Sequence, residues 1–404
     1  MHRPGKAPRP SHPGRVTVIG GGFAGLTAAI TAAEAGAAVT LYEAHATLGG
    51  RARTADAPYR TNEGPHALYN GGPHWSWLKQ RGLLQPVAPV RPAEAVRFRF
   101  HRDGTLRRTP PLGLLRLARK SPELAPVDAD FTTWATRTVG ARGARAAAHY
   151  IAVALFHHDP GSLSARFVQE RLHRAAALPP EAHYPVGGWG ALIDRMAARA
   201  WDLGVRIETD ARVGELPGAA EGPVVVATSL AAARRLLGDD TLDWPSGRTA
   251  LLDLALTARR ADPFVVSDLD APGWLERFSD DADSALSPVG EQLFQGHFPI
   301  APHESKAAGI ARAEALLDAG FPGWRERTTW RREALAAGRT GAVDLPGTTW
   351  RDRPAIDRGH GVYLAGDQTA APGVLSEVAF NSAMEAASLS LTALKLARLD
   401  VYRA

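Results

Sequence analysis

The sequence predicts an α/β fold with two domains, and three observations lead to this prediction. A strand, a glycine-rich turn and an Ala-rich helix follow one another near the start of the chain. Similar strand and helix patterns return in the middle and at the end, while the segments between them look different. A chain of 404 residues also exceeds a single domain of roughly 150 residues. We therefore expect a Rossmann-like nucleotide-binding domain assembled from discontinuous segments, plus an α+β domain with a mixed sheet and helices.

A βαβ unit opens the first predicted domain. Residues 15–19 (RVTVI) form a β-branched run typical of a buried strand, and residues 38–43 (AVTLYE) form a second strand. Residues 24–36 between them have helical spacing, and Gly36 is a plausible stop. The whole unit has the size expected for a mononucleotide-binding half.

The turn between the first strand and the helix matches the pattern G-x-G-x-x-G. Gly20 permits the tight turn, Gly22 lets the backbone approach a pyrophosphate, and Gly25 allows the helix to pack closely on the strand. Phe23 and Ala24 begin the helix, so their N–H groups would face the anion, aided by the helix dipole. We therefore predict a dinucleotide site at this turn.

Glu43 ends the second strand, where a carboxylate can accept hydrogen bonds from both hydroxyls of a ribose. The same charge would repel a 2′-phosphate, which argues against NADP at this site. A nicotinamide or a flavin nucleotide could still fill the turn, and the following segments decide between them.

The segment Leu48–Thr54 (LGGRART) follows the Glu43 strand at once. It resembles the second signature of the flavin amine oxidase and phytoene desaturase superfamily. The resemblance implies that Gly49 and Gly50 pass close to the cofactor and that Arg51 lies near the pyrophosphate and the flavin. It thus implies FAD, and without cysteine the chain cannot form a cysteinyl link to it. We expect FAD to be bound non-covalently.

Residues 62–66 (NEGPH) resemble the family's Gly-Pro turn, whose backbone reaches the isoalloxazine ring. Gly64 and Pro65 carry that role here by resemblance. In the amino-acid oxidases of the superfamily an arginine that binds the substrate carboxylate follows closely. Here His66 and two apolar residues follow instead, which counts against an amino-acid oxidase.

Residues 361–367 (GVYLAGD) resemble the family's closing motif, a strand that ends in Gly-Asp. By that resemblance Gly366 lies at the cofactor and Asp367 bonds its ribityl or phosphate end. A loop containing Val374 and Leu375 then leads to Ser376, a plausible N-cap of the last helix. The positive end of this helix would face the flavin pyrimidine edge and stabilise the negative charge that reduction places there.

An internal segment gives a further resemblance. Residues 184–190, the helix after them and residues 205–213 are similar to the family's middle portion, where a valine backbone meets the adenine. Val213 is the candidate for this contact.

FAD supplies the difficult step by accepting a hydride, and the protein must place a C–H bond over the ring and exclude water. The candidate polar groups near the flavin are His66, Glu63, His74 and Glu377. His66 is the candidate catalytic base because it follows the Gly-Pro turn and because histidine titrates near neutral pH. A structural hydrogen-bonding role is the alternative for His66.

The sequence favours the dehydrogenase and desaturase branch of the superfamily, which acts on apolar C–H bonds. Many amine oxidases of this superfamily place a lysine near flavin N5, but residues 250–257 contain none, and no aromatic pair precedes the last helix. We expect a largely apolar small-molecule substrate and O₂ or another electron acceptor. The alternatives are an amine oxidase that releases hydrogen peroxide, and a non-redox FAD-binding protein or an isomerase that uses reduced flavin.

The predicted domain organisation follows these motifs. A flexible tail covers residues 1–14, residues 15–90, 185–240 and 353–404 form the FAD-binding domain, and residues 91–184 and 241–352 form the substrate domain. We expect strands in the substrate domain at residues 250–257, 264–267 and 292–297. Helices are expected there at residues 112–120, 131–145, 165–177, 305–319 and 327–337.

Composition excludes several other classes of protein. With 0 cysteines the chain has no disulfides or thiolate metal sites, which fits the cytoplasm. The net charge of +5 is spread along the chain, and no aromatic-interleaved basic run suggests nucleic-acid binding. We see neither a secretory signal nor an apolar membrane span. Residues 112–120 could form a helix for peripheral membrane contact or an ordinary amphipathic helix. Residues 157–159 (HHD) lack further ligand spacing, so we expect no metal.

Overall fold

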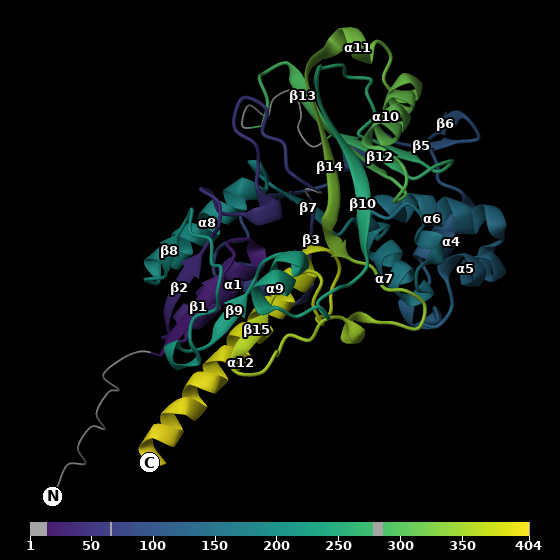
Figure 1. Cartoon of the computed structure of the whole chain (residues 1–404). Coiled ribbons are helices and arrows are strands. Elements are labelled where there is room, and N and C mark those ends of the chain that lie inside the picture. Colours follow the sequence, from purple (N-terminus) through teal and green to yellow (C-terminus); the bar gives the residue numbers. More distant parts are fainter. Residues whose placement is uncertain (1–13, 65–66, 278–285, 404) are drawn as a thin grey trace, which may run out of the picture.

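A computed structural model describes residues 14–64, 67–277 and 286–403 of the chain (Figure 1). It places a parallel sheet with its helices beside a larger mixed sheet, and the fold class predicted from the sequence is confirmed. Of the predicted flexible tail only Gly14 lies within the described residues. A third, small sheet joins three short strands from the first half of the chain.

The first sheet contains five parallel strands in the order β15-β9-β1-β2-β8. Their bounds are β1 Arg15–Ile19, β2 Ala38–Tyr42, β8 Arg206–Glu208, β9 Val224–Val226 and β15 Val362–Leu364. All five come from the three segments that we assigned to the FAD-binding domain. Because the strands are parallel, their carboxyl ends meet at one edge of the sheet, which is where open α/β sheets bind ligands.

Helices from both ends of the chain cover this sheet. Buried alanines let α1 and α12 approach each other closely, among them Ala28 and Ala32 of α1 and Ala383 and Ala387 of α12. In Figure 1 the last part of α12 projects beyond the sheet. The helices of this domain are α1 Phe23–Glu34, α2 Gly72–Gln80, α8 Gly188–Asp202, α9 Leu230–Leu237 and α12 Ser376–Arg403.

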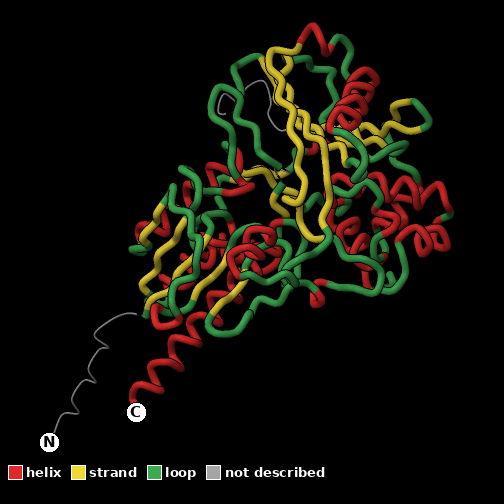
Figure 2. The backbone as a smooth tube through the Cα atoms, in the orientation of Figure 1, coloured by secondary structure: helices red, strands yellow, loops and turns green. Residues whose placement is uncertain are grey.

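The second sheet has seven strands in the order β14-β10-β13-β12-β11-β5-β6 (Figure 2). Only β5 and β11 pair in parallel, and the other neighbours are antiparallel. The strands are β5 Phe98–Arg102, β6 Thr105–Arg107, β10 Ser246–Thr257, β11 Val265–Asp268, β12 Gly273–Arg277, β13 Glu291–Pro299 and β14 Thr328–Ala342.

Helices also surround the second sheet. One core cluster joins α10 to strands β10 and β13 through buried Leu and Phe side chains. Helices α4 to α7 form a separate packed group beside the sheet. The bounds are α3 Pro92–Ala95, α4 Leu112–Ala118, α5 Phe131–Val139, α6 Ala141–Leu155, α7 Ala165–Ala175, α10 Lys306–Gly320 and α11 Trp324–Arg327.

Two of the predicted helices were wrong in part or in whole. Residues 327–337 were expected to form a helix, but Thr328 begins the long strand β14, which pairs with β10 over most of its length. Pairing with the edge of β10 outweighs the helix propensity of this Arg- and Ala-rich segment. The helix expected at residues 131–145 is divided at Gly140, whose φ of +80° ends α5 and begins α6.

A small sheet with the order β3-β7-β4 lies between the two large ones. Its strands are β3 Leu68–Tyr69, β4 Val87–Pro89 and β7 Ala182–Pro185. Here residues 68–69 and 87–89 from the first predicted FAD-binding segment pair with residues that end the first substrate segment. Backbone pairing therefore links two segments that we assigned to different domains from the sequence.

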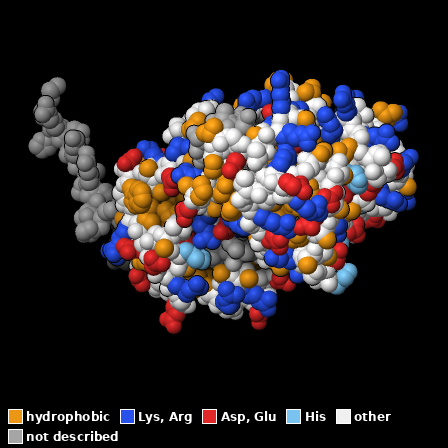
Figure 3. Space-filling model, turned by 90° about the horizontal axis from the view of Figure 1, so that it is seen from above, with side chains coloured by type: hydrophobic (Ala, Val, Ile, Leu, Met, Phe, Trp, Pro, Cys, Tyr) orange, Lys and Arg blue, Asp and Glu red, His pale blue; other side chains and the backbone are white. Residues whose placement is uncertain are grey.

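Within residues 112–120, Leu112–Ala118 form the short helix α4, whose Leu114 and Leu117 are buried against neighbouring helices. Leu112 is the exposed leucine of this helix, so α4 has the burial pattern of an ordinary amphipathic helix. On the face of the molecule drawn in Figure 3, basic and acidic side chains are interspersed. None of the described helices has the length and apolar character that crossing a membrane requires.

We predict that Gly25→Ala destabilises the fold by about 1–3 kcal/mol, in the range for overpacking. A Cβ at this position would lie 1.7 Å from the carbonyl oxygen of Gly20, so the helix and the strand would have to separate. Gly218→Ala is the control, because its Cβ would meet nothing closer than 3.7 Å. The measurement is urea unfolding of both variants, and equal midpoints would contradict the prediction.

Candidate active site

The glycine turn between β1 and α1 forms one end of a large cavity. Gly20 has a φ of +110°, and a Cβ there would lie 2.4 Å from the carbonyl oxygen of Ala227. Around Gly22 the nearest protein atom to such a Cβ is the Gly49 carbonyl oxygen at 3.6 Å, and Gly22 itself lines the cavity. Gly20 therefore serves the turn, while Gly22 keeps the cavity open for a ligand.

The N-terminus of α1 points its first N–H groups toward this cavity. Gly22 is the N-cap, no side chain caps the helix, and no acidic side chain lies in its first turn. Phe23 and Ala24 both line the cavity. An anion in the cavity would therefore satisfy donors that helices commonly leave to capping groups.

Glu43 also lines the cavity, and it supports the glycine turn directly. Its Oε2 accepts a hydrogen bond from the Gly21 N–H at 2.8 Å, and its Oε1 accepts one from the His45 N–H at 3.0 Å. The carboxylate is buried, being 6% exposed. Oε1 also lies 2.7 Å from Nδ1 of His45, so it has two protein partners. Each carboxylate oxygen can accept more than one hydrogen bond, so Oε2 keeps an acceptor site for a ribose hydroxyl. The contact with the turn was not part of the sequence hypothesis.

The Gly-Gly-Arg segment and the Gly-Asp segment meet across the cavity. Nη2 of Arg51 lies 2.5 Å from Oδ1 of Asp367, although 316 positions separate the two residues. Gly49 and Gly50 have φ values of +113° and +54°, which turn the chain toward the glycines of the first turn. The N–H of Gly366 donates to Oγ of Ser382 on α12 at 2.9 Å. Thus both motifs are fixed at the same edge of the sheet.

The start of α12 closes this part of the cavity. Leu375 and Ser376 line it, and Leu375 has a φ of +56°. Ser376 is the first residue of the helix, so the predicted N-cap lies one position too late. Val374 is not among the lining residues, and its N–H donates instead to Oε2 of Glu377 at 3.0 Å.

These segments enclose one cavity of about 680 Å³. It is lined by most of the predicted cofactor residues, which come from positions far apart in the chain. They are Gly20, Gly22, Phe23, Ala24, Glu43, Gly49, Gly50, Arg51, Gly64, Val213, Gly366, Asp367, Leu375 and Ser376. Gly25 lies behind the turn and is not a lining residue, while Pro65 lies outside the described residues.

The second domain supplies the opposite wall of the cavity, which the sequence did not predict. Its lining residues come from the end of α6 and from strands β10 and β14, and none of them that the structure describes is charged. They are Phe156, Leu251, Ala336, Gly338, Thr340 and Gly341. The Thr340 hydroxyl donates to the Gly247 carbonyl at 3.0 Å. No sequence motif marks this wall, because it forms only when distant strands come together.

Phe156 stands out in this wall because of its backbone. It has a φ of +53°, is 6% exposed and ends α6 in the left-handed region, which is rare for a bulky residue. Its carbonyl oxygen would lie 2.0 Å from a Cβ at position 247, a site that only glycine permits. Such local strain is typical of functional sites.

A buried arginine adds positive charge behind the start of α12. Arg171 and Arg353 line a small cavity together with Gly341, Asp367 and Leu375, which also line the large one. Burial, with a further contribution from Arg353, lowers the pKa of Arg171 to about 10, so it stays protonated at neutral pH. Nη2 of Arg171 donates to the carbonyl of Gly373 at 3.3 Å, in the loop before α12.

Of the four polar residues predicted to lie near the flavin, the structure places only one at the cavity within its described residues. His66 lies outside the described residues, so its role stays a prediction. Glu63 lines the cavity and lies 3.4 Å from Nη2 of Arg53. His74 and Glu377 are buried and do not line the cavity. Nε2 of His74 lies 2.8 Å from the carbonyl of Tyr69, and Glu377 pairs with Arg174 at 2.9 Å, so both have structural contacts.

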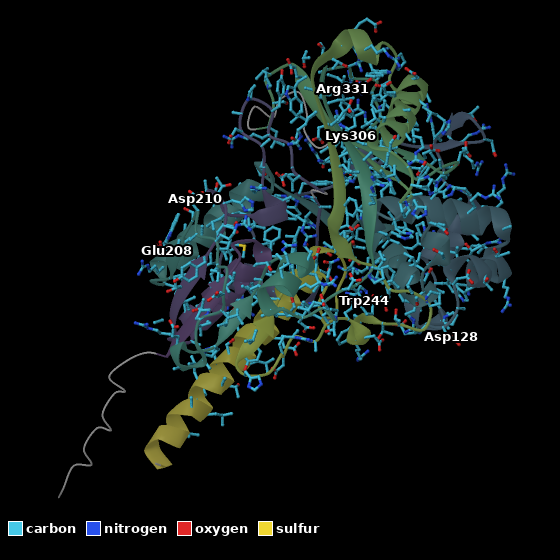
Figure 4. The ribbon with its side chains drawn as sticks, viewed as in Figure 1. Asp128, Glu208, Asp210, Trp244, Lys306 and Arg331 are labelled. Atoms are coloured by element: carbon cyan, nitrogen blue, oxygen red, sulfur yellow. The ribbon has the colours of Figure 1, made fainter. Side chains whose placement is uncertain are left out.

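No lysine lines the cavity within the described residues. Lys306 lies at the start of α10 in the second domain and pairs with Glu333 at 3.3 Å (Figure 4). Among the described residues, one cluster has the geometry of a possible metal site, and it consists of His101, Asp268 and Asp270. Oδ1 of Asp268 accepts hydrogen bonds from the backbone there, so this cluster has a structural role in a turn.

A glycine turn, an acidic residue after β2 and a parallel sheet define the chain as a two-domain protein with a Rossmann-like nucleotide-binding fold. Residues 18–84 match the family model of the NAD(P)-binding Rossmann-like domain. A search of curated protein sequences finds no match.

Solved structures share the fold over nearly the whole chain. An oxidoreductase from Methanosarcina mazei has a TM-score of 0.71 at 18% identity, covering 92% of this chain and 99% of its own. Cyclohexylamine oxidase from Brevibacterium oxydans has a TM-score of 0.70 at 17% identity, covering 95% and 100%. A redesigned putrescine oxidase has a TM-score of 0.70 at 14% identity, again covering 95% and 100%. The resemblance stated from the motifs is thus confirmed in the fold.

His74 provides a prediction about pH. Burial lowers the pKa of His74, and the charge of Glu377 at 3.9 Å opposes this shift without reversing it. Since the unfolded chain binds the proton more readily, His74 costs stability as the pH falls below about 6.5, the ordinary pKa of histidine. We expect His74→Gln to reduce the loss of stability between pH 7 and pH 5. The measurement is the free energy of unfolding in urea for the unaltered protein and the variant between pH 7 and pH 5. The same decrease with pH in both proteins would contradict the prediction.

Proposed function

We propose that the protein is an FAD-dependent oxidoreductase that takes a hydride from a C–H bond of a largely apolar small molecule. One observation carries the proposal: the glycine turn, Glu43, the Arg51–Asp367 pair and the start of α12 line a single cavity. An extended dinucleotide would need its binding groups arranged in this way. The names of the structurally similar proteins, which include two oxidases, agree with it.

The residues present fit FAD, and each would hold a different part of it. The N–H groups at the start of α1 would bind the pyrophosphate, Glu43 would accept from the adenosine ribose, and Val213 would lie at the adenine. Arg51 and Asp367 would hold the phosphate and ribityl portion.

The first turn of α12 carries Glu377, whose charge is paired with Arg174. The N-terminal end of this helix, with the charge of Arg171 behind it, would therefore still favour negative charge at the edge of the ring. When bound, FAD supplies the hydride-accepting atom.

The wall from the second domain supports an apolar substrate. Phe156, Leu251 and Ala336 offer no group that would pair with a charged substrate, and Thr340 already donates to the backbone. A wall of this kind would exclude water and hold a neutral molecule by apolar contact. His66 stays the candidate for a base, and O₂ or another acceptor would take up the electrons.

Amine oxidation is the second candidate function. The names of two structurally similar proteins, cyclohexylamine oxidase and putrescine oxidase, favour it. The described residues of the second-domain wall carry no charge and no described lysine lines the cavity, and both observations favour the apolar substrate. Release of hydrogen peroxide with a panel of amines would identify an amine oxidase. A bound flavin that no substrate reduces would point to the non-redox alternative.

We predict that the purified protein binds FAD and that Glu43→Ala weakens binding by roughly 10- to 100-fold. The change removes hydrogen bonds to a charged acceptor, each contributing about 1.5–3 kcal/mol. Equilibrium titration followed by flavin fluorescence measures the effect. Glu34→Ala is the matched control, because Glu34 lies at the far end of α1 and pairs with Arg81. A protein that takes up no FAD would overturn the proposed function.

We predict that Phe156→Ala shifts the substrate preference toward bulkier molecules, because it opens the wall of the cavity without changing its charge. The measurement is the rate of anaerobic flavin reduction by a series of alicyclic and aromatic alcohols and amines of increasing size. An unchanged order of preference in a folded, FAD-loaded variant would show that Phe156 does not limit the substrate.

A further inference from the structure

A row of polar side chains crosses four neighbouring strands of the second sheet. The strand register pairs Glu276 with Gln295, Gln295 with Asp253, and Asp253 with Arg332. Directly opposed residues of antiparallel strands point to the same face of a sheet. The four side chains therefore form one line across β12, β13, β10 and β14.

This row is buried where it crosses the middle of the sheet. Gln295 is 0% exposed and Asp253 is 1% exposed, which would be costly for polar groups without partners. Nε of Arg332 donates to Oδ2 of Asp253 at 2.8 Å, so the buried carboxylate is neutralised. At the other end Glu276 accepts hydrogen bonds from the hydroxyl of Tyr184 and the indole N–H of Trp274.

Two members of the row donate to the same atom of the first domain. Nε2 of Gln295 lies 2.9 Å from the carbonyl oxygen of Asn62, and Nη2 of Arg332 lies 3.0 Å from it. A carbonyl oxygen has two lone pairs, and here both are used, one of them by a charged donor. Gly64, two residues further along, lines the cavity.

The side chain of Asn62 is held from the opposite direction. Its Oδ1 accepts from the hydroxyl of Thr54 at 2.9 Å and from the N–H of Trp189, the second residue of α8, at 3.1 Å. Asn62 is 1% exposed. The backbone carbonyl of Asn62 is thus fixed by the second sheet, and its side-chain amide is fixed by the Rossmann domain. The position of Asn62 therefore depends on both domains.

We propose that Arg332 and Gln295 are positioning residues that hold residues 62–64 against the cavity, with Asp253 orienting Arg332. This inference rests on the proposed function, because Glu63 and Gly64 line the cavity that we propose for the cofactor. Misplacement of a positioned group by about 1 Å can cost roughly 100-fold in rate. The polar row thereby couples the packing of the second sheet to the geometry of the site.

The test compares Arg332→Lys and Gln295→Met with Arg331→Lys. Lysine keeps a positive charge beside Asp253 but lacks the planar fork that reaches both Asp253 and Asn62. Methionine keeps the approximate size of glutamine and removes its donor. Arg331 is the control because it neighbours Arg332 on β14 but pairs with Glu314 and Glu333, and Figure 4 places it on the second domain.

Hydrogen–deuterium exchange of the protein without FAD is the first measurement. The N–H of Glu63 donates to the carbonyl of Arg53 at 3.2 Å, and its exchange reports on this segment. We expect faster exchange over residues 62–64 in Arg332→Lys and Gln295→Met than in Arg331→Lys, at equal unfolding midpoints. Unchanged exchange in both variants would overturn the proposal, whatever the protein binds.

Titration with FAD is the second measurement. We expect Arg332→Lys to weaken FAD binding by roughly tenfold, the equivalent of one hydrogen bond from a charged donor, and to alter the absorption spectrum of bound flavin. Unchanged affinity and spectrum beside faster exchange would overturn the link to the cofactor. If the unaltered protein takes up no FAD, the proposed function fails, and the exchange data alone then decide whether the row holds residues 62–64.

Discussion

Parallel pairing of β15, β9 and β1 is the constraint on which the site depends. It places the carboxyl ends of these strands at one edge, so the turn after β1 and the Gly-Asp segment after β15 face the same cavity. The Arg51–Asp367 pair and the close packing of α1 on α12 then hold the two ends of the chain together. Without this pairing, the turn after β1 and the Gly-Asp segment after β15, more than three hundred positions apart, would not be held beside the same cavity.

The two walls of the cavity divide the chemistry between them. The Rossmann side offers backbone N–H groups, a helix dipole and the carboxylates of Glu43 and Asp367, which suit the polar parts of a dinucleotide. The described lining residues of the second domain are uncharged, and Phe156 among them is held in a strained conformation. Asn62 links the two domains, since it is hydrogen-bonded to Gln295 and Arg332 of one and to Thr54 and Trp189 of the other. The site therefore depends on both domains.

The sequence predicted the parts of the site that depend on local chemistry. Positions Gly20, Gly25 and Glu43 could be recognised in the sequence because each belongs to a short local pattern. The two glycines belong to a strand-turn-helix motif, and Glu43 ends the next strand. The structure adds that Glu43 also braces the turn through Gly21. Ser376 and Val374 were placed less well, because the exact start of a helix depends on the loop before it.

The parts that depend on distant pairing could not be predicted. Residues 327–337 look helical on their own, and only the edge of β10 explains why they form a strand. Phe156, Leu251 and Thr340 carry no motif, and they become neighbours only when β10, β14 and the end of α6 come together. The polar row from Glu276 to Arg332 depends in the same way on the register of four strands.

A crystal structure of the protein grown with FAD would test the central claim most directly. The account predicts electron density for one FAD that extends from the N–H groups of Phe23 and Ala24, past Asp367, to the start of α12, with its ring facing Phe156. Density for FAD elsewhere on the molecule, or a cavity that stays without it at saturating concentration, would contradict the account.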